Sequence, residues 1–177
     1  MIDYEALIAK YCSGNTELLH IILTHSRQVA DRALTILDAH PQWVESGEID
    51  PVFIEEAAML HDIGVVLCDA PRIHCYGKHA YIEHGYLGAE ILRQEGLPNH
   101  AAVAERHTGT GIDIEQIMRE QLPIPLQDYT PRTLEEKLIC YADKFYSKTK
   151  LGQDKPMTKI RQHMWKYGSD AVLRFDN

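Results

Sequence analysis

The chain has 177 residues, of which 45% are hydrophobic and 25% charged, as in an ordinary globular domain with a substantial core. Its 26 acidic residues outnumber its 18 basic ones, and the formal net charge of -8 excludes a broad cationic face for extended nucleic acid. This charge still allows a local basic pocket for a small anion. Because no run of about 18 apolar residues is present, we expect no segment that spans a membrane.

Two further features bear on the compartment of the protein. The residues that follow Met1 are acidic rather than basic, unlike the start of a secretory signal. The four cysteines are scattered and form no Cys-x-x-Cys pair, which is more typical of reduced thiols than of a disulfide framework. We therefore expect a cytoplasmic protein.

Apolar residues at spacings of three and four predict helices along most of the chain, and no alternating strand pattern or internal repeat is visible. The first half is expected to contain a short helix at 4–11 and a long helix from about Thr16 to about residue 39, which ends before Pro41. A polar loop at 42–50 then leads to a helix at 51–60.

The second half is expected to be helical in the same way. An irregular segment at 65–77 is expected to precede helices at 79–94, 100–106 and 113–121, with Asn99 as the cap of the second. A loop at 122–131 then leads to a helix that is capped by Thr133 and extends to about residue 150. A last helix is expected at about 156–175. These elements predict an all-α fold in a single domain over residues 1–177, with its core at about 17–150.

The most informative stretch runs from Met59 to Gly64, where His61 and Asp62 stand at the end of an apolar helix. Burying an ionised carboxylate in such a place is costly unless a positive charge compensates for it, and a metal cation would do so. A lone His-Asp pair more commonly interacts with itself or caps the helix. The metal interpretation therefore depends on the rest of the chain.

Four other polar side chains lie on predicted apolar faces, namely His25, His84, His107 and Asp143. A lone buried histidine is usually a satisfied core residue, and a lone buried aspartate usually pairs with a basic side chain such as Lys144. Six such residues in one small core would need many specific partners. Their mixture of imidazole and carboxylate suits zinc, iron, manganese, cobalt or nickel.

The six residues could form a buried centre for two divalent transition metals. Asp62 has two oxygens and could bridge both ions. His25, His61 and Asp143 would complete one site, while His84 and His107 would complete the other. Both ions would keep open positions for water, as catalytic ions do. Two further histidines, His40 and His163, lie outside this set and are expected to be dispensable.

The order of these residues resembles the HD superfamily of metal-dependent phosphohydrolases, and His61-Asp62-Ile63-Gly64 matches its HDIG subgroup. The resemblance covers the region from about Glu17 to Lys150. The segments 84–89 and 106–109 look most like the small bacterial members that hydrolyse diadenosine tetraphosphate at a dinuclear centre. The resemblance implies the same two ligand sets, joined by Asp62.

Two departures argue against a cyclic-di-GMP phosphodiesterase. Members with that activity carry a lysine three residues after the aspartate, where this chain has Val65. They also carry paired histidines where this chain has Arg106-His107, and no Gly-Tyr-Pro follows.

The leading hypothesis is an enzyme that cleaves a phosphoester or phosphoanhydride, such as a nucleotide, with water activated by the metals. Asp62 or Asp143 would orient the nucleophile. Candidate substrate-binding residues are Arg106, Lys144, Lys148 and His79. Either His79 or His74 would protonate the leaving group. Exposed helix charges and surface histidines are the simpler interpretation of these groups.

Two alternatives remain open at this stage. Some HD-fold enzymes hold a mixed-valence di-iron pair and use oxygen, although the inositol-cleaving type has a substrate lysine at the position of Val65. A non-catalytic nucleotide sensor would keep the ligands and lose turnover. The expected partner is a small phosphorylated molecule, with no membrane and no extended nucleic acid, and a homodimer is left open.

Overall fold

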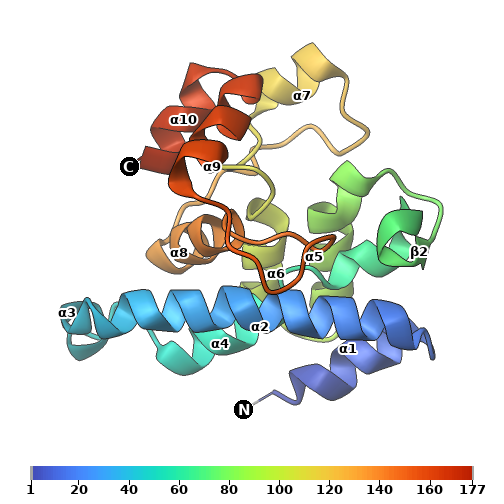
Figure 1. The fold of residues 1–177 in the computed structure, drawn as a ribbon, viewed down its shortest axis with the longest axis horizontal. Helices are drawn as coiled ribbons and strands as arrows, with labels where there is room; N and C mark the ends of the chain where they lie inside the picture. Colours follow the sequence, from blue (N-terminus) through green and yellow to red (C-terminus); the bar gives the residue numbers. More distant parts are fainter. Residues whose placement is uncertain (1, 177) are drawn as a thin grey trace.

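The computed structural model describes residues 2–176, in which helices form nearly all of the regular structure (Figure 1). The helices are α1 (Tyr4–Cys12), α2 (Thr16–Asp38), α3 (Pro41–Glu45), α4 (Pro51–Leu60), α5 (His84–Gln94), α6 (Pro98–Arg106), α7 (Ile114–Glu120), α8 (Leu134–Asp143), α9 (Met157–Met164) and α10 (Ser169–Asp176). The prediction of an all-α fold is confirmed. Among residues 2–176, no helix combines the length and apolar character needed to cross a lipid bilayer.

The remaining regular structure is short. It consists of the 3-10 turns η1 (Ile63–Leu67), η2 (Pro71–Ile73), η3 (Tyr81–Glu83) and η4 (Trp165–Tyr167), and the strands β1 (Asp69–Ala70) and β2 (Cys75–Tyr76). The two strands pair in antiparallel register, with Asp69 opposite Tyr76. The segment expected to be irregular is therefore a compact hairpin, with η1 before it and η2 joining its two strands.

Helix α2 is the element around which the others are arranged. It crosses the width of the molecule, with α1 and α4 on one side, while α7, α9 and α10 lie on the opposite side, farthest from α1 and α4 (Figure 1). The side chain of Asn15 caps its first turn by accepting a hydrogen bond from the Leu18 amide, 3.0 Å away. Its apolar stripe packs against α1, α4 and α8.

The apolar core has two main parts along α2. Ile22 of α2 packs in one cluster with residues of α1, η1 and α5, and Val29 of α2 packs in another with residues of α4 and α8. His25 lies between these two positions on the same buried stripe. A polar centre is thus enclosed between two apolar clusters that fix the helices around it. A third cluster joins α9 and α10 to Phe145.

Several predicted element boundaries were wrong, mostly at prolines and at the helix ends. Helix α3 occupies part of the expected 42–50 loop, because Pro41 is well suited to a first helical turn. Pro98 likewise starts α6 before Asn99, so Leu97 is the N-cap residue. The expected helix at 156–175 is broken at Gly168, whose φ of 105° is a conformation that glycine adopts readily.

Two of these differences change the environment of the centre. Helix α5 begins at His84 rather than His79, so His84 is its first residue. Helix α8 ends at Asp143 rather than near residue 150, and residues 144–156 form a loop that turns back towards α2 (Figure 1). Lys148 therefore lies on this loop and not on a helix.

A close approach of two glycines brings η1 against α5. A Cβ atom at Gly64 would lie 2.1 Å from the carbonyl oxygen of His84 and 2.3 Å from the amide nitrogen of Gly88. Only glycine can fill such a position without a shift of the backbone. This contact places His61 and Asp62, which precede Gly64, beside the first turn of α5.

We predict that Gly64→Ala lowers the free energy of unfolding by about 3 kcal/mol or more, because the methyl group would meet backbone atoms. The melting temperature should fall by roughly 6–12 °C. Gly47→Ala is a suitable control, since Gly47 has a φ of 74° but no atom within 4 Å of an added Cβ. That change should cost only about 1 kcal/mol of backbone strain. Equal losses in thermal denaturation would contradict the proposed role of the Gly64 contact.

Candidate metal centre

The centre begins at the end of α4. The side chain of Asp50 caps this helix, and Pro51 occupies its first turn. The helix ends at Leu60, so that His61 becomes its C-cap and Asp62 precedes η1. Both side chains are 0% exposed. A fully buried carboxylate therefore stands at the junction of two helical segments.

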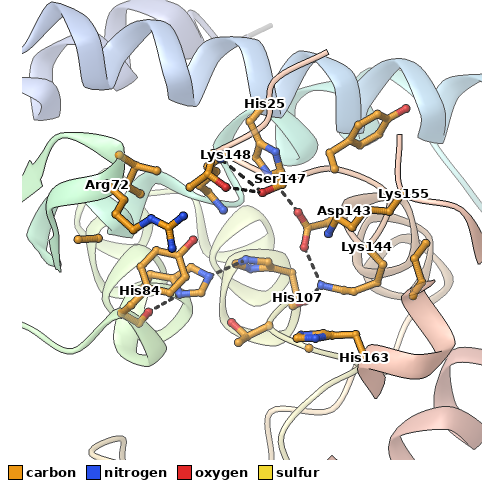
Figure 2. A pocket seen from close by; sticks show the side chains of 18 of the residues that line it. His25, Arg72, His84, His107, Asp143, Lys144, Ser147, Lys148, Lys155 and His163 are labelled. Carbon is orange, nitrogen blue, oxygen red and sulfur yellow. Dashed lines mark hydrogen bonds and ion pairs between the residues drawn. The ribbon is translucent and has the colours of Figure 1, made fainter. Parts of the chain in front are cut away.

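The other four residues of the predicted set come from four different helices or helix ends. His25 lies in the middle of α2, His84 begins α5, His107 follows α6, and Asp143 ends α8. The three histidines each lie within 3.5 Å of a carboxylate oxygen of Asp62. Figure 2 shows these histidines and Asp143 around one cavity. His25 and Asp143 are 118 positions apart in the sequence, yet His25 Nε2 lies 3.0 Å from Asp143 Oδ1. The packing of the helices thus brings all six residues together.

One group lies on the Oδ2 side of Asp62. His25 Nε2 and His61 Nε2 lie 3.1 and 3.0 Å from this oxygen. Asp143 Oδ1 lies 3.0 Å from His25 Nε2 and 3.6 Å from His61 Nε2. Two imidazole nitrogens and two carboxylate oxygens therefore face one another, with one candidate ligand atom from each residue within 4.8 Å of the others.

A second group lies on the Oδ1 side of Asp62. His84 Nε2 and His107 Nε2 lie 3.5 and 3.3 Å from this oxygen and 3.0 Å from each other. Two adjacent ligands bound at ~2.1 Å, with about a right angle between them, are separated by roughly this distance. Both groups use Asp62, and each of its two oxygens faces a different group.

Backbone carbonyl groups orient three of the four imidazole rings. The Nδ1 atom of His61 lies 2.6 Å from the carbonyl oxygen of Ala58, and that of His107 lies 2.7 Å from the carbonyl oxygen of Ala104. His84 makes the same contact with Tyr81 at 2.6 Å. A proton on Nδ1 that is donated to a carbonyl leaves Nε2 free to bind a cation, as metal-ligating histidines require.

The polar atoms of this centre fit a bound metal. His61 Nε2 and both oxygens of Asp62 are buried and have no hydrogen bond of good geometry, although the ammonium group of Lys148 lies 2.5 Å from Asp62 Oδ2. Buried polar atoms without partners are rare in native proteins. Imidazole and carboxylate ligands together suit divalent transition metals. The two groups could therefore hold divalent cations.

The pKa shifts agree with an ionised Asp62 beside two neutral imidazoles, those of His84 and His107. Burial would lower the pKa of His61, but Asp62 and Asp143 outweigh this effect and raise that pKa to about 9. Burial alone would raise the pKa of Asp62, but the positive charges of His61 and Lys148 hold it well below its usual value. Burial and the neighbouring His107 lower the pKa of His84 to about 3. Burial also lowers the pKa of His107. The imidazole rings of His84 and His107 are thus neutral at physiological pH and can bind a cation.

A cavity of about 600 Å³ opens onto the centre. His25, His84, His107 and Asp143 form part of its wall, whereas His61 and Asp62 are fully buried and do not line it. Ligand atoms on the wall can be reached by a molecule that enters from solvent. This arrangement is typical of a catalytic centre and differs from a closed structural metal site.

Two of the predicted substrate-binding residues line this cavity. Lys144 is buried, and its ammonium group contacts Asp143 Oδ2 at 2.6 Å and the carbonyl oxygen of His107 at 3.1 Å. Lys148 extends from the loop after α8 to Asp62. Both lysines thus neutralise a carboxylate of the centre and can also meet an anion at its open side.

The structure does not bring the other predicted residues to this cavity. Arg106 faces a separate charged crevice, where its guanidinium group lies 2.5 Å from Glu136. Neighbouring residues on a helix point in different directions, so Arg106 does not share the orientation of His107. His79 is exposed and interacts with Glu83 at 3.2 Å, and His74 is also exposed.

Four cavity residues were missed or set aside in the sequence, namely Arg72, Tyr81, Lys155 and His163. Arg72 comes from η2, while Lys155 and His163 come from the loop after α8 and from α9. His163 was expected to be dispensable, but it lies on the cavity wall. His40 does lie outside this cavity, with its ring stacked 4.4 Å from that of Trp43.

The relation of the chain to known proteins agrees with this geometry. Residues 22–147 match the family model of the HD domain. The chain is 41% identical over 104 residues to an uncharacterized protein of Methanocaldococcus jannaschii, covering 58% of this chain and 54% of that protein. No solved structure matches at a significant level.

Two further relatives are named tRNA (cytidine(56)-2'-O)-methyltransferase. The one from Picrophilus torridus is 31% identical over 159 residues, which cover 87% of this chain and 39% of that protein. The one from Thermoplasma volcanium is 29% identical over 127 residues, covering 71% and 32%. This chain thus spans about a third to a half of the length of the relatives it matches. The matched region contains all six residues of the buried centre, and the chain belongs to the HD domain family.

Proposed function

We propose that this chain is a metal-dependent phosphohydrolase that cleaves a phosphoester or phosphoanhydride bond in a nucleotide or another small phosphorylated molecule. The observation that carries the proposal is that candidate metal ligands and lysine side chains line the same cavity. Four of the six candidate metal ligands line the same cavity as Lys144 and Lys148. Metal ligands and cations placed together suit an anionic substrate.

We further propose that the centre is dinuclear, in line with the HDIG-type motif. His25, His61 and Asp143 would hold one divalent ion, and His84 and His107 would hold the second. Asp62 would serve both, since its two oxygens face different groups. The ligand chemistry accommodates iron, manganese, zinc, cobalt or nickel.

The roles of the residues follow from their positions. When bound, divalent ions lower the pKa of coordinated water and neutralise phosphoryl oxygens. Asp143 lies on the cavity wall, where its carboxylate can orient the nucleophile. Lys144 and Lys148 can bind the oxygens of the phosphate that is cleaved. Tyr81, whose ring lies 5.7 Å from the Lys148 ammonium, closes this side of the cavity.

The identity of the nucleotide rests on resemblance alone. The segments around His84 and His107 resemble those of diadenosine tetraphosphate hydrolases, which makes dinucleoside tetraphosphates the first substrates to test. The two methyltransferase relatives are named for a cytidine of tRNA, so 2'- and 3'-phosphorylated nucleosides belong in the same screen. Because one fold can host different substrates, both classes should be assayed directly.

We predict that the variants of the centre differ in metal stoichiometry. Protein loaded with Mn²⁺ and then freed of excess ion should hold two ions per chain. Asp62→Ala should lose both ions because it removes the shared carboxylate, whereas His84→Ala should lose only one. Elemental analysis by mass spectrometry would measure the content.

The exposed His20, which lies on α2 with His25, provides the control. His20→Ala should keep the full metal content. Retention of two ions by Asp62→Ala would disprove the bridging role. Circular dichroism would show whether a variant that loses metal is still folded.

We also predict that the metal-loaded protein releases phosphate or a nucleoside phosphate from at least one nucleotide. A chelator should abolish the reaction, and Asp143→Asn should lower kcat by at least roughly a hundredfold, since it removes a charged ligand. Phosphate release and liquid chromatography of the products would measure both effects.

Two outcomes would contradict the proposal of a hydrolase. A metal-loaded sample that cleaves no phosphoester in a broad screen, yet consumes oxygen with an organic substrate, would indicate a di-iron oxygenase. A sample that binds nucleotides without either reaction would indicate a sensor. Oxygen uptake and nucleotide binding should therefore be measured on the same preparation.

A further inference from the structure

One wall of the cavity comes from residues outside the region that matches the HD domain. That region ends at residue 147, and the wall beyond it contains Lys155, Ile160, His163, Met164 and Tyr167. Figure 2 shows Lys155 and His163 on the side of the cavity where Asp143 lies, with Arg72 on the opposite side near His84. This wall therefore lies outside the matched family model and beside the proposed metal centre.

The charge of Lys155 has no carboxylate partner within the part of the chain that the structure describes. Lys144 and Lys148 each contact a carboxylate of the centre, whereas the side chain of Lys155 makes no hydrogen bond or ion pair among residues 2–176. Its backbone amide alone is bonded, to the carbonyl oxygen of Phe145 at 2.7 Å. A half-buried ammonium group on a cavity wall thus has free donors.

The surroundings of Lys155 favour an anion. Burial and the positive charges of Lys144 and Lys148 lower the pKa of Lys155, although Asp143 acts in the opposite direction. Several cations crowded on one wall repel one another, and a multiply charged anion relieves that repulsion. His163, whose ring makes no hydrogen bond in the described residues, adds a further donor on α9.

The loop that carries Lys155 is held in place by Arg32 of α2. The guanidinium group of Arg32 lies 3.9 Å from the centre of the Phe145 ring, and its Nε donates a hydrogen bond to the hydroxyl of Tyr146 at 3.0 Å. The same group forms an ion pair with Asp154, next to Lys155. Both ends of the loop are thus fixed to one side chain, and Lys155 is positioned before any ligand arrives.

We propose that Lys155 and His163 form a subsite for a second phosphate group, one that is bound but not cleaved. The inference rests on the proposed phosphohydrolase function and adds a substrate class to it. Lys144 and Lys148, which contact the centre, meet the phosphate that reacts. Lys155 and His163 meet the next phosphate, so the site prefers molecules with two or more linked phosphates over monoesters.

Equilibrium binding of two inorganic probes tests the subsite without requiring turnover. The probes are methylenediphosphonate, whose carbon bridge resists hydrolysis, and orthophosphate. Each would be titrated calorimetrically into protein in saturating Mn²⁺, so that chelation by the probe does not strip the centre. Wild-type protein should bind methylenediphosphonate more tightly than orthophosphate.

We predict that Lys155→Met weakens methylenediphosphonate binding roughly tenfold, because it removes a charge-assisted contact and keeps the aliphatic stem. Orthophosphate binding should change by less than roughly twofold, since that probe needs only the reacting position. The matched control is Lys150→Met, which removes an exposed lysine of the same loop that does not line the cavity. It should alter neither affinity.

Three results would overturn the subsite. The first is that wild-type protein binds methylenediphosphonate no more tightly than orthophosphate. The second is that Lys155→Met binds methylenediphosphonate as tightly as the wild type does. The third is that Lys155→Met weakens the binding of both probes equally, which would indicate only the overall positive potential of the cavity. His163→Gln gives an independent variant for the same comparison. Failure of the hydrolase proposal would appear separately, as absence of phosphate release in a protein that still shows the binding difference.

Discussion

The need to compensate one buried negative charge organises the centre of this protein. Asp62 is fully enclosed, and an isolated carboxylate in such surroundings would be protonated or would destabilise the fold. Four imidazoles and the ammonium group of Lys148 surround it instead. These groups come from four helices and a loop, so all five elements meet at a single side chain.

The apolar core provides the framework that makes this arrangement tolerable. The two clusters along α2 hold α1, α4, α5 and α8, and they leave His25 between them. The tight contact at Gly64 then fixes the distance between the turn that carries Asp62 and the first turn of α5. Hydrophobic packing therefore places the helices, and the polar groups need only meet within a preformed space.

The sequence predicted the centre better than its surroundings, for a physical reason. The ligands lie on apolar stripes, and helical periodicity shows which face of a helix is buried. His25 is the best example, since it sits on a stripe with Ile22 and Val29. Periodicity gives no information about loops, whose paths depend on distant contacts. The end of α8 was therefore misplaced, and neither Lys155 nor the Arg32 contacts that hold its loop could be foreseen.

The hydrogen bonds of His61, His84 and His107 have a consequence for thermal motion. Each Nδ1 contacts a carbonyl oxygen only three residues earlier in the chain, so each ring is aimed by its own short peptide. A small rigid shift of one helix against another would carry the ring and its carbonyl together. Motions of the core can therefore alter the distances between the three rings, while each ring keeps its orientation relative to its own helical segment.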